Sequence, residues 1–135
     1  MLRRLIAGTS AGLFLTAGLV GSSAEAAYQP WGGTSAADQV LKSSCAHYHY
    51  RYRIDPPTDD WAAEIFLVGP KGGALASAAL DVNSDPATGV EHWRLCRPSL
   101  TPGRYKIRMK ITYLVDHYDK YEGFVKPSYF RLKRR

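Results

Sequence analysis

The sequence lacks every short motif that would identify a common enzyme. Its 135 residues contain no Gly-x-Ser-x-Gly turn, no His-Glu-x-x-His pattern and no phosphate-binding loop. Its acid pairs, such as Asp59-Asp60, fall in predicted loops, where solvation explains them. A chain of this length could hardly build a deep catalytic cleft in addition to a core. We therefore expect a protein that is not an enzyme.

A long apolar run is also missing. The stretch from Leu5 to Val20 is interrupted by glycine, threonine and serine, and it is short for a membrane helix, which needs about 20 residues. It follows Arg3 and Arg4 and precedes the small-residue site Ala24-Glu25-Ala26, a pattern typical of a cleaved signal peptide. A retained anchor is the alternative. We expect residues 1–26 to be a signal peptide, so that the mature protein is secreted and contacts the membrane only before cleavage. A leader of this kind suits a bacterium.

Cysteine is scarce, with only Cys45 and Cys96 in the chain. Neither directly follows the apolar run, so a lipidated N-terminus is not expected. In an exported chain the simplest outcome is one disulfide between them, whereas free thiols or a thiolate metal site would suit the cytosol. The bridge would close a loop of about 50 residues and contribute roughly 4 kcal/mol in the chain-entropy model. This support matters because a single small domain has a small core.

Helical periodicity is absent outside Thr34 to Lys42, and short runs rich in tyrosine, valine, isoleucine, leucine and tryptophan alternate with Pro, Gly and Asn-Asp clusters. This spacing is typical of an all-β sandwich or barrel. Residues 27–40 are rich in glycine, serine, proline and alanine, which predicts a flexible N-terminal arm before a domain at 41–135. The predicted strands are Leu41–Ile54, Trp61–Val68, Leu75–Leu80, Val90–Arg97, Tyr105–Val115 and Gly123–Leu132.

The clearest strand runs from Arg104 to Val115. Its residues alternate strictly between apolar and polar over this length, which is the pattern of a strand with one face in a core and one in water. The outward side carries four positive side chains in a row, namely Arg104, Lys106, Arg108 and Lys110. Like charges in line repel one another, so such a row indicates an anionic partner or acidic neighbours on the next strand, such as Glu64.

The run Leu100-Thr-Pro-Gly-Arg-Tyr105-Lys-Ile107 resembles the entry to the sixth strand of immunoglobulin-like domains. The resemblance implies an antiparallel β-sandwich of about six to seven strands, in which the Tyr105 hydroxyl folds back to the preceding loop as a tyrosine corner. Trp61 would approximate the core tryptophan of that family. The chain departs from antibody-type domains at Ile107, where those domains carry a bridging cysteine. The resemblance concerns fold and not function.

Alternate residues of a strand face opposite sides, and this alternation places both cysteines away from the core. Cys45 shares its side with the histidines and arginines of its strand, and Cys96 lies on the polar side of its own. We therefore expect an exterior disulfide within one sheet, between strands that are neighbours in the resembled architecture. An antiparallel register with Cys45 opposite Cys96 would place His47 opposite Arg94 and His49 opposite His92.

Two groups of side chains are candidate metal ligands. His47, His49 and His92 would gather on one face and could hold Zn²⁺ or Cu²⁺, although the nearby arginines would repel a cation. The alternative is a solvated polar face. Asp81, Asn83 and Asp85 resemble the start of a calcium loop, but Pro86 and His92 stand where an EF-hand needs glycine and glutamate. A looser Ca²⁺ site and plain turn chemistry both remain open.

Positive charge exceeds negative charge in the mature chain. Loss of Arg3, Arg4 and Glu25 with the leader leaves 16 Lys and Arg against 11 Asp and Glu. This excess favours anionic partners, although a small soluble domain also commonly carries such a charge. We expect no resident cofactor and no nucleic acid partner, because the chain is predicted to be exported. The sequence thus predicts a secreted binding module that engages an anionic envelope polymer or extracellular protein, with a divalent-metal-binding protein as the alternative.

Overall fold

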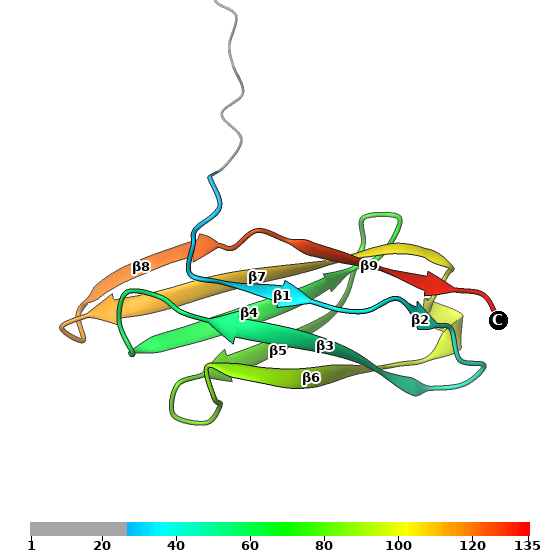
Figure 1. Cartoon of the computed structure of the whole chain (residues 1–135), viewed down its shortest axis with the longest axis horizontal. Helices are drawn as coiled ribbons and strands as arrows, with labels where there is room; N and C mark the ends of the chain where they lie inside the picture. Colours follow the sequence, from blue (N-terminus) through cyan, green and yellow to red (C-terminus); the bar gives the residue numbers. More distant parts are fainter. Residues whose placement is uncertain (1–26) are drawn as a thin grey trace, which may run out of the picture.

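The computed structural model describes residues 27–135, so the predicted signal peptide lies outside the described residues (Figure 1). This part of the chain is all-β and contains no α-helix, only a short 3-10 helix, Arg97–Ser99. The strands are β1 (Gly32–Ser35), β2 (Gln39–Val40), β3 (Ala46–Ile54), β4 (Trp61–Val68), β5 (Ala74–Asp81), β6 (Thr88–Leu95), β7 (Gly103–Val115), β8 (Asp119–Phe124) and β9 (Ser128–Lys133).

The strands form two sheets packed as layers. The smaller sheet has the order β1-β3-β6, and the larger has the order β2-β9-β7-β4-β5, with β8 pairing to the far end of β7. Every pairing is antiparallel except that of β2 with β9. The N-terminal segment crosses from one sheet to the other, because β1 joins β3 and β2 joins β9. The predicted all-β fold with two antiparallel sheets is confirmed.

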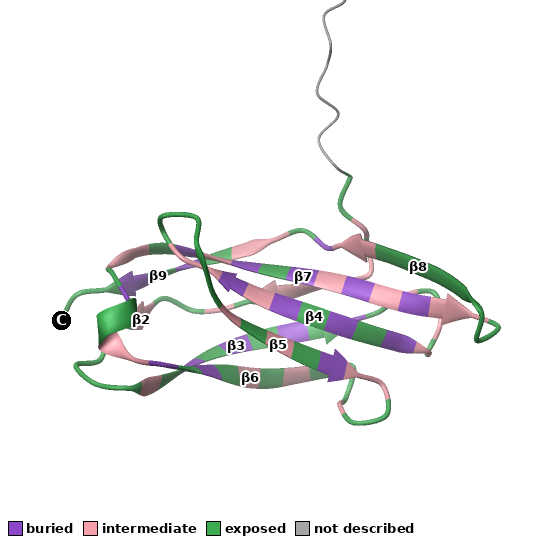
Figure 2. Ribbon diagram, turned by 180° about the vertical axis from the view of Figure 1, so that it is seen from behind, coloured by how far each residue is buried: buried purple, intermediate pink, exposed green. Residues whose placement is uncertain are grey.

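Strand β7 is the longest strand and lies at the centre of the larger sheet (Figure 1). Its alternation appears in Figure 2 as bands of buried and less buried residues along one ribbon. Tyr105, Ile107, Met109 and Ile111 are fully enclosed in the core. Residues between them point outward, as the period of two in the sequence predicts. The strand therefore contributes packing on one side and a row of polar side chains on the other.

The opposite wall of the core is built from aromatic side chains of the smaller sheet. Tyr48, Tyr50 and Tyr52 alternate along β3 and are all buried, and the Tyr50 ring stacks on Trp93 of β6 with 3.9 Å between ring centroids. Burial disfavours the phenolate, and the carboxylate of Glu91 adds to this effect, so the pKa of Tyr50 is raised. These tyrosines are packing residues, as their alternate spacing predicts.

Tyr105 makes the contact that the immunoglobulin-like resemblance implies. Its hydroxyl donates to the carbonyl oxygen of Thr101 at 2.6 Å and accepts from the Thr101 amide at 3.2 Å. The side chain thereby ties the loop before β7 to the core while its ring stays fully buried. Trp61 is also buried, at the start of β4.

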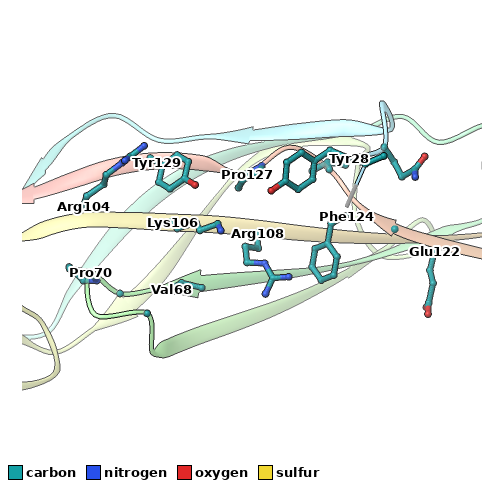
Figure 3. Close-up of a pocket in the computed structure, with 16 residues that line it drawn as sticks. Tyr28, Val68, Pro70, Arg104, Lys106, Arg108, Glu122, Phe124, Pro127 and Tyr129 are labelled. Carbon is teal, nitrogen blue, oxygen red and sulfur yellow. The ribbon is translucent and has the colours of Figure 1, made fainter. Parts of the chain in front are cut away.

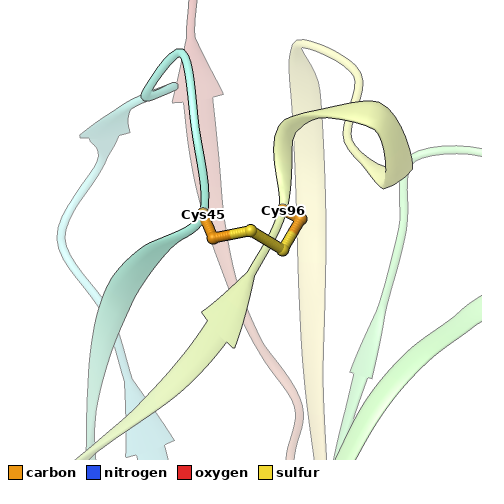
Figure 4. The surroundings of a disulfide bond; sticks show 2 residues. All are labelled: Cys45 and Cys96. Carbon is orange, nitrogen blue, oxygen red and sulfur yellow. A yellow bond between two sulfur atoms is a disulfide. The ribbon is translucent and has the colours of Figure 1, made fainter.

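The disulfide and its register are confirmed. Cys45 and Cys96 are bonded just beyond the first pair of the β3–β6 ladder, as Figure 4 shows. His47 lies opposite Arg94, and His49 lies opposite His92. Cys45 is exposed, and the disulfide joins segments that continue two strands of one sheet. The disulfide therefore lies outside the core.

The prediction of a flexible arm at 27–40 is wrong, because this segment supplies β1 and β2. Its sequence carries no apolar alternation, so pairing with the backbone of β3 and β9 decides its structure. Gly32 permits this approach, since a Cβ at that position would lie 2.1 Å from the Arg53 carbonyl oxygen. Trp31 then packs edge-on against Tyr113, with 4.9 Å between ring centroids.

The C-terminal strand prediction is also corrected. The range Gly123–Leu132 is two strands, because the ladder to β7 is interrupted between Phe124 and Ser128, where Pro127 has no amide to donate. β8 (Asp119–Phe124) begins upstream of the predicted range. Most of its residues are exposed, so it has no apolar face that would reveal a strand. The real turn is Asp116 to Tyr118, in which Asp116 and His117 adopt positive φ angles.

Candidate anion-binding groove

An open groove of about 870 Å³ lies along the outer face of the larger sheet (Figure 3). Its floor is the outward side of β7. Its walls come from the N-terminal segment, the β8–β9 connection and the β4–β5 loop. The side chains that shape it are Tyr28, Pro70, Arg104, Lys106, Arg108, Glu122, Phe124, Pro127 and Tyr129. We call this feature the β7 groove.

The break between β8 and β9 creates the groove. β9 pairs with β7 from Gly103 to Ile107 and β8 pairs with it from Lys110 onward, so the strand that neighbours β7 on this side changes beside Arg108. The N-terminal segment closes this region, because the Gln29 amide donates to the Phe124 carbonyl oxygen at 2.8 Å. That bond holds the neighbouring Tyr28 at the rim of the groove, where its side chain is half exposed.

Three of the four predicted basic residues line the groove. Arg104, Lys106 and Arg108 occupy alternate positions of β7, and a strand advances about 3.3 Å per residue, so the two arginines are roughly 13 Å apart along the strand. Within residues 27–135, none of these three side chains forms an ion pair with a carboxylate. Their charge is therefore available to an anion from outside the chain.

Aromatic rings support two of these cations. The Arg104 guanidinium carbon lies 3.8 Å from the centroid of the Tyr129 ring, and that of Arg108 lies 4.2 Å from the Phe124 centroid. Figure 3 shows the two pairs at successive positions along β7. A guanidinium that lies over an aromatic ring contacts the ring with its flat face. The N–H donors at the edge of the guanidinium stay free for a carboxylate, sulfate or phosphate. The rings thereby orient the donors before a ligand arrives.

Lys110, the fourth predicted residue, differs from the other three. Its Nζ lies 2.9 Å from Oε2 of Glu64, which stands opposite it on β4. The hydrogen bond and charge of Glu64 raise the pKa of Lys110. This ion pair is the acidic neighbour on the next strand that the sequence indicated as an alternative to an anionic partner. Lys110 does not line the groove.

Glu122 is the one acidic residue that lines the β7 groove in the described part of the chain. Its Oε2 lies 3.9 Å from Nζ of Lys120, at the end of the groove opposite Arg104 (Figure 3). The groove therefore carries an excess of positive charge that is concentrated at the β9 end.

The histidine face on the smaller sheet assembles as the register predicts. The rings of His47 and His92 stack with centroids 4.2 Å apart, and His49 meets His92 edge-on at 5.8 Å. However, between residues 27 and 135 no three His, Cys, Asp or Glu side chains are arranged to hold a metal ion.

The Asp81 loop uses its carboxylates within the turn. Oδ1 of Asp81 accepts from the amides of Asn83 and Ser84, at 2.8 and 3.1 Å, and Oδ2 of Asp85 accepts from the Asp81 amide at 3.0 Å. Both side chains therefore stabilise the β5–β6 connection. The geometry favours turn chemistry over the predicted calcium site.

Sequence reasoning missed the aromatic half of the groove. The sequence predicts Tyr129 only as part of the strand Gly123–Leu132, and Tyr28 as part of a flexible arm. One signal was present for Tyr129, because it falls on the exposed side of β9 together with Arg131 and Lys133. A large aromatic residue on an exposed strand face often marks a binding surface. Tyr28 and Phe124 gave no such signal, since their segments lack alternation.

Comparisons with known proteins give little further information. No protein-family model matches the chain, and no curated protein matches it. Among solved structures, the C-terminal domain of wzt is similar over 82% of each chain, with 11% identical residues and a TM-score of 0.39. A likeness at this level carries no argument about function.

Two observations bear on the cellular setting. The Cys45–Cys96 disulfide indicates an oxidising environment, as found outside the cytoplasm. Across residues 27–135, the structure has no helix with the length and apolar character needed to cross a membrane.

Proposed function

We propose that this protein is an exported, non-enzymatic binding module that engages an anionic envelope polymer or extracellular protein through the β7 groove. The observation that carries this proposal is the set of three cations without carboxylate partners, Arg104, Lys106 and Arg108, in one groove. Two of them rest on aromatic rings. Cations kept free of internal partners cost the fold mutual repulsion, which a bound anion relieves.

The fold proposal extends to an immunoglobulin-like sandwich. It is supported by the pairing of β3 with β6 in one sheet and of β4, β7 and β9 in the other, which corresponds to the strand neighbours of that family. The bond from Tyr105 to Thr101 supports it as well. Export is supported by the disulfide and by the leader pattern at residues 1–26.

Binding should be electrostatic in character. We expect the protein to bind heparin and polyglutamate but not neutral dextran, and its affinity for both polyanions should fall steeply with salt. The Debye length shrinks from about 30 Å at 0.01 M salt to about 3 Å at 1 M, so attraction between exposed charges is largely lost over that range. Isothermal titration calorimetry in a salt series measures this. Binding that is insensitive to salt, or absent for both polyanions, would contradict the proposal.

A further inference from the structure

The shape of the β7 groove restricts its ligand. Sites for small molecules usually enclose most of the ligand surface, whereas this groove is open to solvent along β7 and has walls on both sides (Figure 3). An open groove gains affinity from several contacts repeated along an extended chain. The shape thus favours an extended polymer over a small solute.

The chemistry of the lining restricts the polymer further. The basic forks of Arg104 and Arg108 suit oxyanions, while the exposed parts of Tyr28 and Tyr129, at 53% and 44%, offer apolar ring surface between and beside them. A sugar ring presents C–H groups on its faces and charged or hydroxyl groups at its edge. A chain of acidic sugars therefore carries both kinds of group that this lining complements. Polyphosphate or an acidic peptide would use the arginines and leave the rings unused.

We propose that the β7 groove binds an extended acidic polysaccharide, with sugar-borne oxyanions on Arg104 and Arg108 and sugar faces on Tyr28 and Tyr129. This inference rests on the proposed function of the groove. The roughly 13 Å between the two arginines along β7 requires a chain long enough to reach both. The oxyanion is a carboxylate or a sulfate, since the N–H groups of a guanidinium donate hydrogen bonds to either one.

Length dependence tests the inference. Oligogalacturonates (carboxylate) and heparin-derived oligosaccharides (sulfate) of increasing length should show no measurable binding as monosaccharides. Their affinity should rise at least tenfold once the chain spans both arginines, and it should level off when the groove is filled. The series that shows this step identifies the oxyanion. Polyphosphate, short duplex DNA and anionic vesicles of equal charge serve as comparison probes, and tighter binding to any of them would overturn the inference.

Tyr28→Ala separates sugar contacts from charge, because Tyr28 supports no cation in the structure. The variant should bind the long oligosaccharide about fivefold more weakly, the change expected when roughly 40 Å² of apolar ring surface stays exposed. Its affinity for polyphosphate should not change. Tyr118→Ala is the matched control, since Tyr118 is 88% exposed in the turn after β7 and does not line the groove.

The outcomes separate the two proposals. If no polyanion binds, the proposed function of the groove fails. If polyanions bind but Tyr28→Ala weakens none of them and length gives no step, the groove binds anions and the polysaccharide inference fails.

Discussion

Replacing both cysteines, with Cys45→Ala and Cys96→Ala together, is expected to lower the free energy of unfolding by about 4 kcal/mol. The two residues are 51 positions apart, so the bridge removes much of the conformational freedom of the unfolded chain. It also joins β3 to β6, and β6 has no other neighbour in the three-stranded sheet. Without the bond, only the ladder and the core contacts hold this strand in place.

The effect is large for a domain of this size. Small domains have a total stability of roughly 5–15 kcal/mol, and a domain near 100 residues loses about 4–8 °C of melting temperature per kcal/mol. Urea unfolding followed by circular dichroism measures the change. The wild-type protein with its disulfide reduced is the control, and it should match the double variant. A loss below about 1 kcal/mol would show that the cross-link contributes little.

The second large effect concerns binding. Arg104→Ala with Arg108→Ala is expected to reduce affinity for a sulfated polysaccharide by about 100-fold, since hydrogen bonds to charged groups contribute roughly 1.5 kcal/mol or more each and 1.4 kcal/mol is tenfold. The two cations are held over Tyr129 and Phe124, so little ordering is needed when the ligand binds. Titration calorimetry at one fixed salt concentration gives the ratio.

Lys110→Ala is the matched control for this experiment. Lys110 lies on the same face of the same strand and carries the same charge, but it is bonded to Glu64 and does not line the groove. Its replacement should change the affinity by no more than about twofold, because a screened charge that lies away from the bound ligand contributes little. An equal loss in the control and the double variant would indicate general charge attraction rather than a site. Each arginine stacked on a ring contributes about 0.5–1 kcal/mol to the stability of the fold, so its removal destabilises the protein slightly. Thermal melts of each variant therefore verify that it is still folded.

The register of the smaller sheet could be predicted because two independent constraints agreed. The cysteine pair placed Cys45 opposite Cys96, and the alternation of apolar and polar residues decided which side chains faced outward. Every further pair then followed by counting, including His49 opposite His92. The alternation of β7 likewise predicted its buried and outward faces from Arg104 onward.

The N-terminal strands could not be predicted in the same way. β1 is Gly-Gly-Thr-Ser and gains its structure from backbone bonds to β3, so its own side chains carry no pattern. The Gln39 side chain extends this pairing, as its amide both donates to the His49 carbonyl oxygen and accepts from the His49 amide, each at 3.1 Å. Such contacts between distant segments leave no periodicity in the sequence.

The candidate site was half predictable for a related reason. The outward cations of β7 follow from alternation along one strand. The rings that support them, Phe124 and Tyr129, come from β8 and β9, and Tyr28 comes from the N-terminal segment. Only the three-dimensional arrangement brings these three side chains beside that row. A row of charge was therefore visible in the sequence, whereas a groove was not.

The most direct test of the account is a nuclear magnetic resonance titration of the ¹⁵N-labelled protein with a sulfated oligosaccharide. The molecule has a second basic surface on the smaller sheet, where Arg51 and Arg94 lie near the histidine face. We predict that the side-chain Nε–H signals of Arg104 and Arg108 and the amide of Tyr129 will shift most. If the largest shifts fall instead on Arg51, Arg94 and the histidines of β3 and β6, the β7 groove is not the binding site.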